Sequence, residues 1–211
     1  MKEYKLPIGC DVPETIILAD GDFPSHPLAL EWLRQCPYVV CCDGAANTYI
    51  RSGRMPEAIV GDGDSLLPDI KERYASLIHS EAEQETNDLS KAFRFCLSQE
   101  RKRITIMGAT GKREDHTIGN VSLLADYMEQ AEVSMMTDYG IFVPIREDSM
   151  FESYIGQQIS VFNMNSTALS AEGLAYPLSV FTNWWQGTLN EALARHFIIR
   201  TEGKVLVLRV L

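Results

Sequence analysis

The chain has 211 residues, and 45% of them are hydrophobic, which is enough apolar material for a globular core. Its formal net charge is -10, from 19 lysines and arginines against 29 aspartates and glutamates. This acidity argues against binding of nucleic acid, which requires a positive surface. It does not exclude an anionic small substrate, because a local basic spot or a bound divalent cation can reverse the field at one site.

The first residues contain no apolar stretch of signal-peptide length, and no apolar run in the chain is long enough to span a membrane. The five cysteines form no CxxC pair, and their odd number argues against a disulfide framework. We therefore expect a cytoplasmic protein without membrane contact. Cys41 and Cys42 lie together in an apolar stretch, where buried, unreactive side chains are expected.

The first two thirds of the chain alternate between short apolar runs and helical patterns. The expected strands are Thr15–Asp20, Tyr38–Asp43, Ala58–Asp62, Ile104–Ala109 and Glu132–Asp138. The expected helices are Pro27–Arg34, Asp88–Glu100 and Thr117–Met128. Because the strand segments are continuously apolar rather than alternating, they are typical of strands buried on both faces. The alternation predicts an α/β region with an open, mainly parallel sheet and flanking helices.

The last third, from about Met150, shows short strand patterns without helices between them. The two final apolar runs are separated by a turn containing Glu202 and Gly203, which predicts a β-hairpin. We therefore expect two domains, an α/β domain over residues 1–145 and a smaller all-β sandwich or jelly roll over residues 146–211.

Acidic and glycine-rich segments follow the expected strands. Asp43 follows the second strand, and Asp62 and Asp64 lie in a glycine-rich loop after the third. In open α/β sheets ligands bind beyond the carboxyl ends of the strands, so these carboxylates should meet at one edge. Clustered carboxylates favour a hard cation such as Mg²⁺ or Ca²⁺, and Mg²⁺ typically shares its ligands with substrate phosphates.

Two further segments carry polar groups at the starts of expected helices. In the first, Thr86 or Asn87 is expected to cap the helix that carries Asp88 and Lys91 three residues apart. The second, residues 108–116, is a glycine-rich connection from strand to helix that can present backbone N–H groups to phosphate. Its spacing differs from that of a P-loop. Asp115 is expected to cap the helix that follows it.

Together these motifs resemble the thiamine pyrophosphokinase family. The resemblance rests on an ordered set: Asp-Gly-Ala-Ala-Asn (43–47), Gly-Asp-x-Asp-Ser (61–65), Gln-Glu-x-Asn-Asp-x-x-Lys (84–91), Gly-Ala-Thr-Gly-Lys-Arg-x-Asp-His (108–116) and Gly119-Asn120. The last third resembles the family more loosely, through residues 173–178 and 188–190. Gly63, Glu85, Asn87, Lys112 and Leu189 depart from the residues usual in the family.

The resemblance implies Mg²⁺-dependent transfer of a diphosphate group from ATP to the hydroxyl of thiamine, with AMP as the by-product. It also implies a homodimer and a C-terminal domain that recognises thiamine. The acidic metal and catalytic positions would be Asp43, Asp62, Asp64 and Asp88, with Asp115 as a further catalytic candidate. Nucleotide-binding positions would be Gly21, Asn47, Gln84, Lys91, Arg113, His116 and Asn120. Thiamine-binding positions would be Tyr176 and Asn190.

Several alternatives stay open from the sequence. Either Asp88 or Asp115 is placed to orient the acceptor hydroxyl or to take its proton. The aromatic face for the thiamine rings has three candidates, Tyr176, Trp184 and Trp185, although the two tryptophans also suit core or interface packing. Another Mg²⁺-dependent, nucleotide-using transferase would use the same carboxylates. A catalytically silent thiamine-binding module and a plain dimeric scaffold are the non-enzymatic alternatives.

Overall fold

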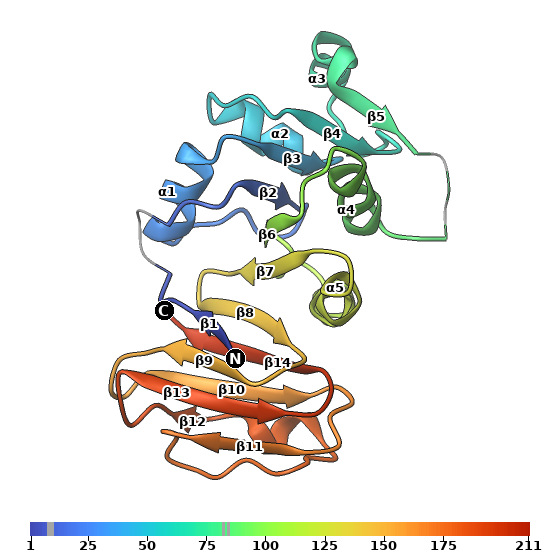
Figure 1. The fold of residues 1–211 in the computed structure, drawn as a ribbon. Helices are drawn as coiled ribbons and strands as arrows, with labels where there is room; N and C mark the ends of the chain where they lie inside the picture. The colour runs from blue at the N-terminus through green and yellow to red at the C-terminus, as the bar shows by residue number, and fades with distance from the viewer. Residues whose placement is uncertain (8–10, 82, 84) are drawn as a thin grey trace.

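The computed structural model describes residues 1–7, 11–81, 83 and 85–211, so Gln84 lies outside the described residues (Figure 1). Its strands form a ten-stranded sheet, in the order β12-β10-β14-β8-β7-β6-β2-β3-β4-β5, and a four-stranded sheet, in the order β1-β9-β13-β11. Figure 1 shows helices flanking the upper part of the molecule and strands stacked in the lower part. The coarse prediction of an α/β region followed by a strand-rich region is confirmed.

Six neighbouring strands of the long sheet are parallel. Their bounds are β2 Thr15–Leu18, β3 Val39–Cys42, β4 Ala58–Gly61, β5 Ile78–Ser80, β6 Arg103–Met107 and β7 Glu132–Met136. Every residue of β2, β3 and β4 is buried, as their continuously apolar sequences predict. Cys41 and Cys42 are buried thiols in β3, which confirms their expected packing role.

Helices cover both faces of this parallel region. On one face lie α1 Pro27–Gln35, α2 Ala45–Arg51 and α3 Pro68–Arg73, and on the other lie α4 Asp88–Ser98 and α5 Glu114–Tyr127. Two short 3-10 helices cover residues Ala75–Leu77 and Trp184–Gly187. The helix predictions are confirmed for α1, α4 and α5. The sequence did not predict α2 and α3, because helices of seven and six residues are too short to show a clear apolar periodicity.

One of the two predicted helix caps is present in the structure. Asn87 caps α4, because its side-chain oxygen accepts a hydrogen bond from the backbone N–H of Ser90 at 2.9 Å. The expectation that Asp115 caps α5 is wrong: the helix begins at Glu114, and Asp115 lies in its first turn. The Asp115 carboxylate instead accepts hydrogen bonds from the guanidinium of Arg113, the N-cap residue.

The strand-rich region extends the long sheet in antiparallel fashion and packs a second sheet against it. The long sheet continues with β8 Gly140–Ile145, β10 Gln158–Asn163, β12 Asn190–Glu191 and β14 Val205–Val210. The second sheet contains β1 Lys2–Tyr4, β9 Ser149–Glu152, β11 Leu169–Glu172 and β13 His196–Thr201. Buried residues of both sheets, among them Phe197 and Val207, belong to one hydrophobic core. The jelly-roll topology stays a prediction.

The predicted C-terminal hairpin is wrong. β13 pairs with β9 and β11 in the short sheet, whereas β14 pairs with β8 and β10 in the long sheet. The turn at residues 202–204 therefore crosses between two packed sheets. Both strands have one buried face, and a local apolar pattern cannot distinguish pairing within a sheet from packing across two sheets.

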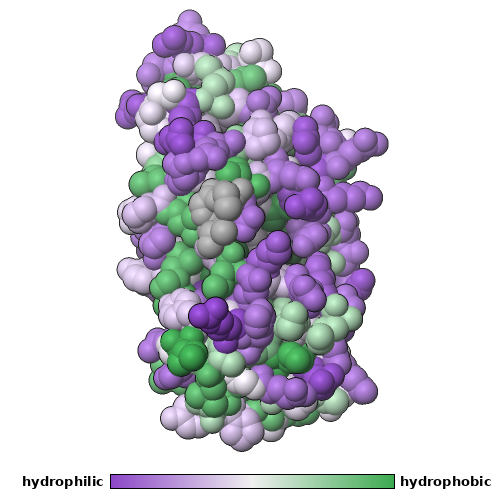
Figure 2. Space-filling model, turned by 60° about the vertical axis from the view of Figure 1, so that its left-hand side comes forward, coloured by the Kyte–Doolittle hydropathy of each residue, from purple (hydrophilic) through white to green (hydrophobic). Residues whose placement is uncertain are grey.

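No helix among the described residues is long and apolar enough to cross a membrane. Figure 2 shows one face of the molecule, on which hydrophilic residues dominate and hydrophobic patches interrupt them, several of them in the strand-rich part at the bottom. Exposed large side chains in the strand-rich region include Tyr176, Trp185, Leu189 and Leu193, with exposed fractions between 55% and 78%.

Candidate functional site

A cavity of about 420 Å³, which we call the carboxyl-edge cavity, lies at the carboxyl ends of the parallel strands. Its walls come from the loops after β2, β4 and β6 and from the first turns of α4 and α5. Seven residues predicted from the sequence line it: Gly21, Asp62, Asp88, Lys91, Arg113, His116 and Asn120. Segments far apart in the chain therefore meet where the parallel topology predicted.

Other predicted residues do not line this cavity: Asp43, Asn47, Asp64, Asp115, Tyr176 and Asn190. Conversely, sequence reasoning assigned no site role to several residues that do line it: Asp20, Ser65, Thr86, Asn87 and Lys112. Asp20 and Lys112 carried a usable signal, because each follows a buried parallel strand by only a few residues.

Asp43 lies immediately after β3 and is 3% exposed. Its Oδ2 accepts a hydrogen bond from the backbone N–H of Ser65 at 3.0 Å, which ties it to the Gly61–Ser65 loop. Its buried Oδ1 has no hydrogen-bond partner among the residues that the structure describes. Burial raises the pKa of Asp43, and the neighbouring carboxylates of Asp88 and Asp62 raise it further. Asp43 is thus a carboxylate without full compensation, beside two others.

Residues that do not line the cavity hold the loop that carries Asp62 and Asp64. The Asp64 backbone N–H donates to Oδ1 of Asp62 at 3.0 Å, whereas the Asp64 side chain is exposed. Asn47, on α2, donates to the carbonyl of Ser65 at 2.8 Å and accepts from the N–H of Leu67 at 3.0 Å. In this structure Asn47 therefore positions the acidic loop and does not face the cavity.

Asp88 and Lys91 form an ion pair in the first turn of α4, with 3.2 Å between Lys91 Nζ and Asp88 Oδ1. The Lys91 side chain is only 3% exposed, whereas that of Asp88 is 37% exposed. A partner of opposite charge offsets the cost of burying an ammonium group. The pair therefore places a fixed positive group and an accessible carboxylate on the same wall of the cavity.

Two asparagines join the N-cap of α4 to the second turn of α5. Asn87 Nδ2 donates to Oδ1 of Asn120 at 3.1 Å, and Asn120 Nδ2 donates to the carbonyl of Ala109 at 2.9 Å. These bonds connect the cap of α4, the side of α5 and the loop after β6. They set the position of Asp88 relative to the glycine-rich loop.

Arg113 and Asp115 form a pair at the rim, with 67% and 62% of their side chains exposed. The Arg113 guanidinium lowers the pKa of Asp115 to about 2, and the backbone N–H of His116 contributes. Arg113 and His116 line the cavity and Asp115 does not. A strongly ionised carboxylate bound to a guanidinium is a poor proton acceptor, which argues against Asp115 as a general base.

Gly21 allows the loops after β2 and β6 to lie against each other. Its N–H donates to the carbonyl of Gly108 at 2.6 Å, and a Cβ at position 21 would overlap the carbonyl oxygens of Gly108 and Thr110. Any other residue would push the two loops apart. Gly21 therefore maintains the shape of this wall.

In the strand-rich region, Asn190 is 4% exposed and Tyr176 is 64% exposed. The Asn190 amide accepts from the Tyr176 N–H at 3.0 Å and donates to the Tyr176 carbonyl at 2.8 Å. Asn190 thus holds the backbone of an outward-facing tyrosine. Trp184 is 45% exposed and packs edge-on against Phe162, and Trp185 is 73% exposed.

The described residues bring no group of three or more His, Cys, Asp or Glu side chains into an arrangement that could hold a metal ion by itself. The donor set nevertheless suits a hard cation, since the partnerless Oδ1 of buried Asp43 lies beside the charges of Asp62 and Asp88. Mg²⁺ usually takes only one or two protein carboxylates and completes its shell with water and phosphate oxygens.

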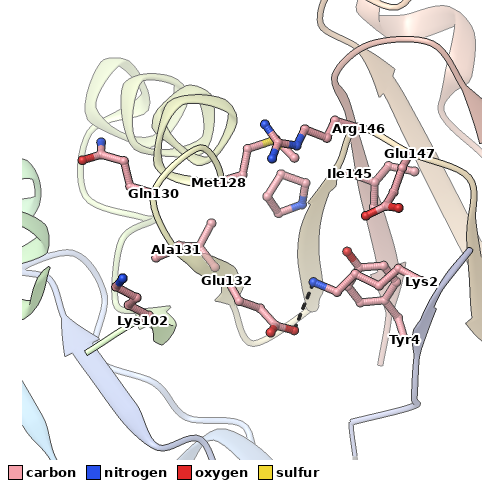
Figure 3. Close-up of a pocket in the computed structure, with 12 residues that line it drawn as sticks. Lys2, Tyr4, Lys102, Met128, Gln130, Ala131, Glu132, Ile145, Arg146 and Glu147 are labelled. Atoms are coloured by element: carbon pink, nitrogen blue, oxygen red, sulfur yellow. Dashed lines mark ion pairs between the residues drawn. The ribbon is translucent and has the colours of Figure 1, made fainter. Parts of the chain in front are cut away.

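A second hollow, the amino-edge pocket, has a volume of about 320 Å³. It lies near the starts of β6 and β7, the end of β8 and the C-terminal end of α5 (Figure 3). Lys2 points across it to Glu132, with 3.3 Å between the charged atoms. Lys102, Arg146 and Glu147 complete its charged lining. None of the predicted site residues that the structure describes lies in it.

Comparison with known proteins agrees with this arrangement. Residues 29–136 match the family model described as "Thiamin pyrophosphokinase, catalytic domain", and residues 140–208 match "Thiamin pyrophosphokinase, substrate-binding domain". The first match alone spans more than half of the chain. The chain therefore belongs to the thiamin pyrophosphokinase family.

Individual relatives point the same way. The chain is 30% identical over 129 residues to thiamine pyrophosphokinase 1 of Oryza sativa subsp. japonica, and the matched region covers 49% of each of the two chains. It is 34% identical over 86 residues to thiamine pyrophosphokinase of Bacillus subtilis, which covers 39% of this chain and 40% of that protein. The chain thus spans about half the length or less of these relatives.

Solved structures show the same fold over nearly the whole chain. Thiamin pyrophosphokinase from Candida albicans superposes with a TM-score of 0.80 at 18% identity, covering 100% of this chain and 93% of that one. Thiamine pyrophosphokinase from Bacillus subtilis superposes with a TM-score of 0.78 at 21% identity, covering 93% and 98%. At these identities the likeness establishes the fold.

Proposed function

We propose that this chain is a thiamine diphosphokinase that transfers a diphosphate group from ATP to the hydroxyl of thiamine, releasing AMP. The observation that carries the proposal is the carboxyl-edge cavity, which Asp62, Asp88, Lys91 and Arg113 line together, with the uncompensated Asp43 beside Asp62 and Asp88. Transfer of this kind depends mainly on positioning and on neutralising negative charge, and these groups serve both needs.

In this proposal Asp43, Asp62 and Asp88 would hold Mg²⁺, and the backbone N–H of Asp64 orients the Asp62 carboxylate. The bound ion would neutralise phosphate charge and orient the diphosphate group. Lys91 and Arg113 bind phosphate oxygens, and Asn120 keeps the glycine-rich loop in place. Asp88, whose carboxylate is 37% exposed in the cavity, orients the thiamine hydroxyl.

The proposed division of labour assigns residues 1–145 to nucleotide binding and catalysis and residues 146–211 to thiamine recognition and dimerisation. The exposed aromatic and aliphatic side chains of the strand-rich region suit contact with a second copy of the chain, including Tyr176 and Trp185. Asn190 supports thiamine binding by holding Tyr176. We place the enzyme in the cytoplasm as a homodimer, and sedimentation analysis tests the dimer.

Product analysis tests the activity. Purified protein is incubated with ATP, Mg²⁺ and thiamine, and AMP and thiamine diphosphate are separated by chromatography. We expect equal amounts of both products, abolished by a chelator and by omission of thiamine. Release of pyrophosphate or of a nucleoside diphosphate instead would indicate another nucleotide-using transferase. Thiamine binding without any product would indicate a silent binding module.

A further inference from the structure

Lys112 lies in the loop between β6 and α5 and lines the carboxyl-edge cavity. Its Nζ lies 3.0 Å from Oδ1 of Asp20 and 2.8 Å from the Asp20 carbonyl oxygen, across the gap to the loop after β2. Both residues also line a smaller cavity of about 140 Å³ on their other side. The Lys112–Asp20 pair therefore stands at the boundary between two hollows.

The backbone at this position is unfavourable for a lysine. Lys112 has a φ of +55°, in the left-handed region, where a residue with a Cβ is strained and glycine is not. The ion pair offsets little of that strain, because water screens these side chains, which are 54% and 45% exposed. The local backbone conformation therefore gives no reason for a lysine at this position.

The charges around the cavity show what the lysine can do. Among the described residues, its lining contains three carboxylates, Asp20, Asp62 and Asp88, and three cations, Lys91, Lys112 and Arg113. Lys91 is buried against Asp88 and has little freedom to move. Lys112 has a flexible alkyl chain and three N–H donors. Because water already screens its interaction with Asp20, little free energy is lost when the ammonium exchanges the Asp20 carboxylate for another anion.

We propose that Lys112 is a polyphosphate-binding residue of the nucleotide site, which rests on the proposed function. In the ligand-free protein Asp20 holds its ammonium, and when ATP enters, Nζ moves from the Asp20 carboxylate to a phosphate oxygen. Asp20 is then a competitor of the nucleotide for the lysine. The two members of the pair therefore have opposite effects on ATP affinity.

The test is calorimetric titration of the full chain with ATP and Mg²⁺ in the absence of thiamine. Lys112→Gly should weaken ATP binding about tenfold or more, because it removes a charge-assisted hydrogen bond. It should weaken AMP binding much less, and its melting temperature should not fall, since glycine suits the backbone. Lys112→Arg should keep most of the affinity. Asp20→Asn should tighten ATP binding by releasing the ammonium.

The outcomes separate this inference from the proposed activity. If Lys112→Gly binds ATP like the unmodified chain, or if Asp20→Asn and Lys112→Gly weaken ATP binding equally, the lysine is only part of a structural pair and the inference fails. If the unmodified chain binds no ATP, both proposals fail. If Lys112→Gly loses ATP affinity but the unmodified chain makes no thiamine diphosphate, only the proposed acceptor fails.

Discussion

The carboxyl-edge cavity and the amino-edge pocket lie at opposite edges of the sheet. Charged side chains line both, but the two differ in how deeply those charged groups are buried. Both contain carboxylates and cations in close pairs. At the carboxyl edge, charged groups lie buried beneath the surface. The Lys91 side chain is nearly inaccessible to solvent, and Oδ1 of Asp43 has no hydrogen-bond partner among the described residues. At the amino edge, the Lys2–Glu132 pair is 37% and 53% exposed. Charge on the lining is thus common to both hollows, and the burial of the charged groups distinguishes the two linings.

The sharpest test of this contrast removes one carboxylate from each hollow. Asp62→Ala should lower turnover about 10²–10³-fold, because it removes a preorganised charge from the reacting phosphates. Glu147→Ala, in the amino-edge pocket, is the matched control and should leave turnover unchanged. The measurement is steady-state formation of thiamine diphosphate, with circular dichroism to check that both variants fold. Near-normal turnover of Asp62→Ala would remove it from the proposed metal site.

A second test compares two lysines. Lys91→Met keeps the buried alkyl stem but removes the ammonium, and we expect the KM for ATP to rise about 10–100-fold. Lys102→Met makes the same change in the amino-edge pocket, and there the KM for ATP should stay as in the unmodified chain. Equal KM values for the two variants would contradict the phosphate-binding role of Lys91.

A third test measures whether the buried carboxylate of Asp43 destabilises the folded chain when it is charged. The pKa of Asp43 is raised in the folded protein, so the folded state binds the carboxyl proton more tightly than the unfolded state does. Protonation of Asp43 therefore stabilises the fold, and this stabilisation is lost as the pH rises through the raised pKa. With chelator present, Asp43→Asn should therefore gain stability relative to the unmodified chain as pH rises above the ordinary value of 3.8. The gain should reach its full size once the pH exceeds the raised pKa of Asp43.

Urea unfolding at several pH values measures this difference in the free energy of unfolding. Added Mg²⁺ should reduce it, because a bound cation stabilises the charged carboxylate of the unmodified chain but has less to bind in Asp43→Asn. A difference that does not change with pH, or that Mg²⁺ leaves unaltered, would argue against a cation beside Asp43.

The smallest effect is expected at the exposed pair of the amino edge. Lys2→Ala should change the free energy of unfolding by about 0.2–1 kcal/mol and leave turnover unchanged, because water screens the Lys2–Glu132 pair. Thermal unfolding at low and high salt provides the measurement. A large loss of activity in Lys2→Ala would show that the amino-edge pocket is coupled to catalysis and would contradict the contrast between the two hollows.

The parallel core and the general place of the site follow from the amino-acid sequence alone. Continuously apolar strands such as β2 and β3 have to be buried on both faces, and parallel strands have their carboxyl ends at one edge. The motifs that follow these strands, including those with Asp62 and Lys91, are therefore assigned to one edge of the sheet by their positions in the chain.

How neighbouring polar groups divide their roles depends instead on tertiary packing. Asp62 lines the cavity while Asp64, two residues away, is exposed, and Asp115 is bound to Arg113 and does not cap its helix. The same holds for strand partners, since β13 and β14 are adjacent in the chain but belong to different sheets. Local patterns record burial and periodicity, whereas side-chain partners and strand pairing depend on segments distant in sequence, which only packing brings together.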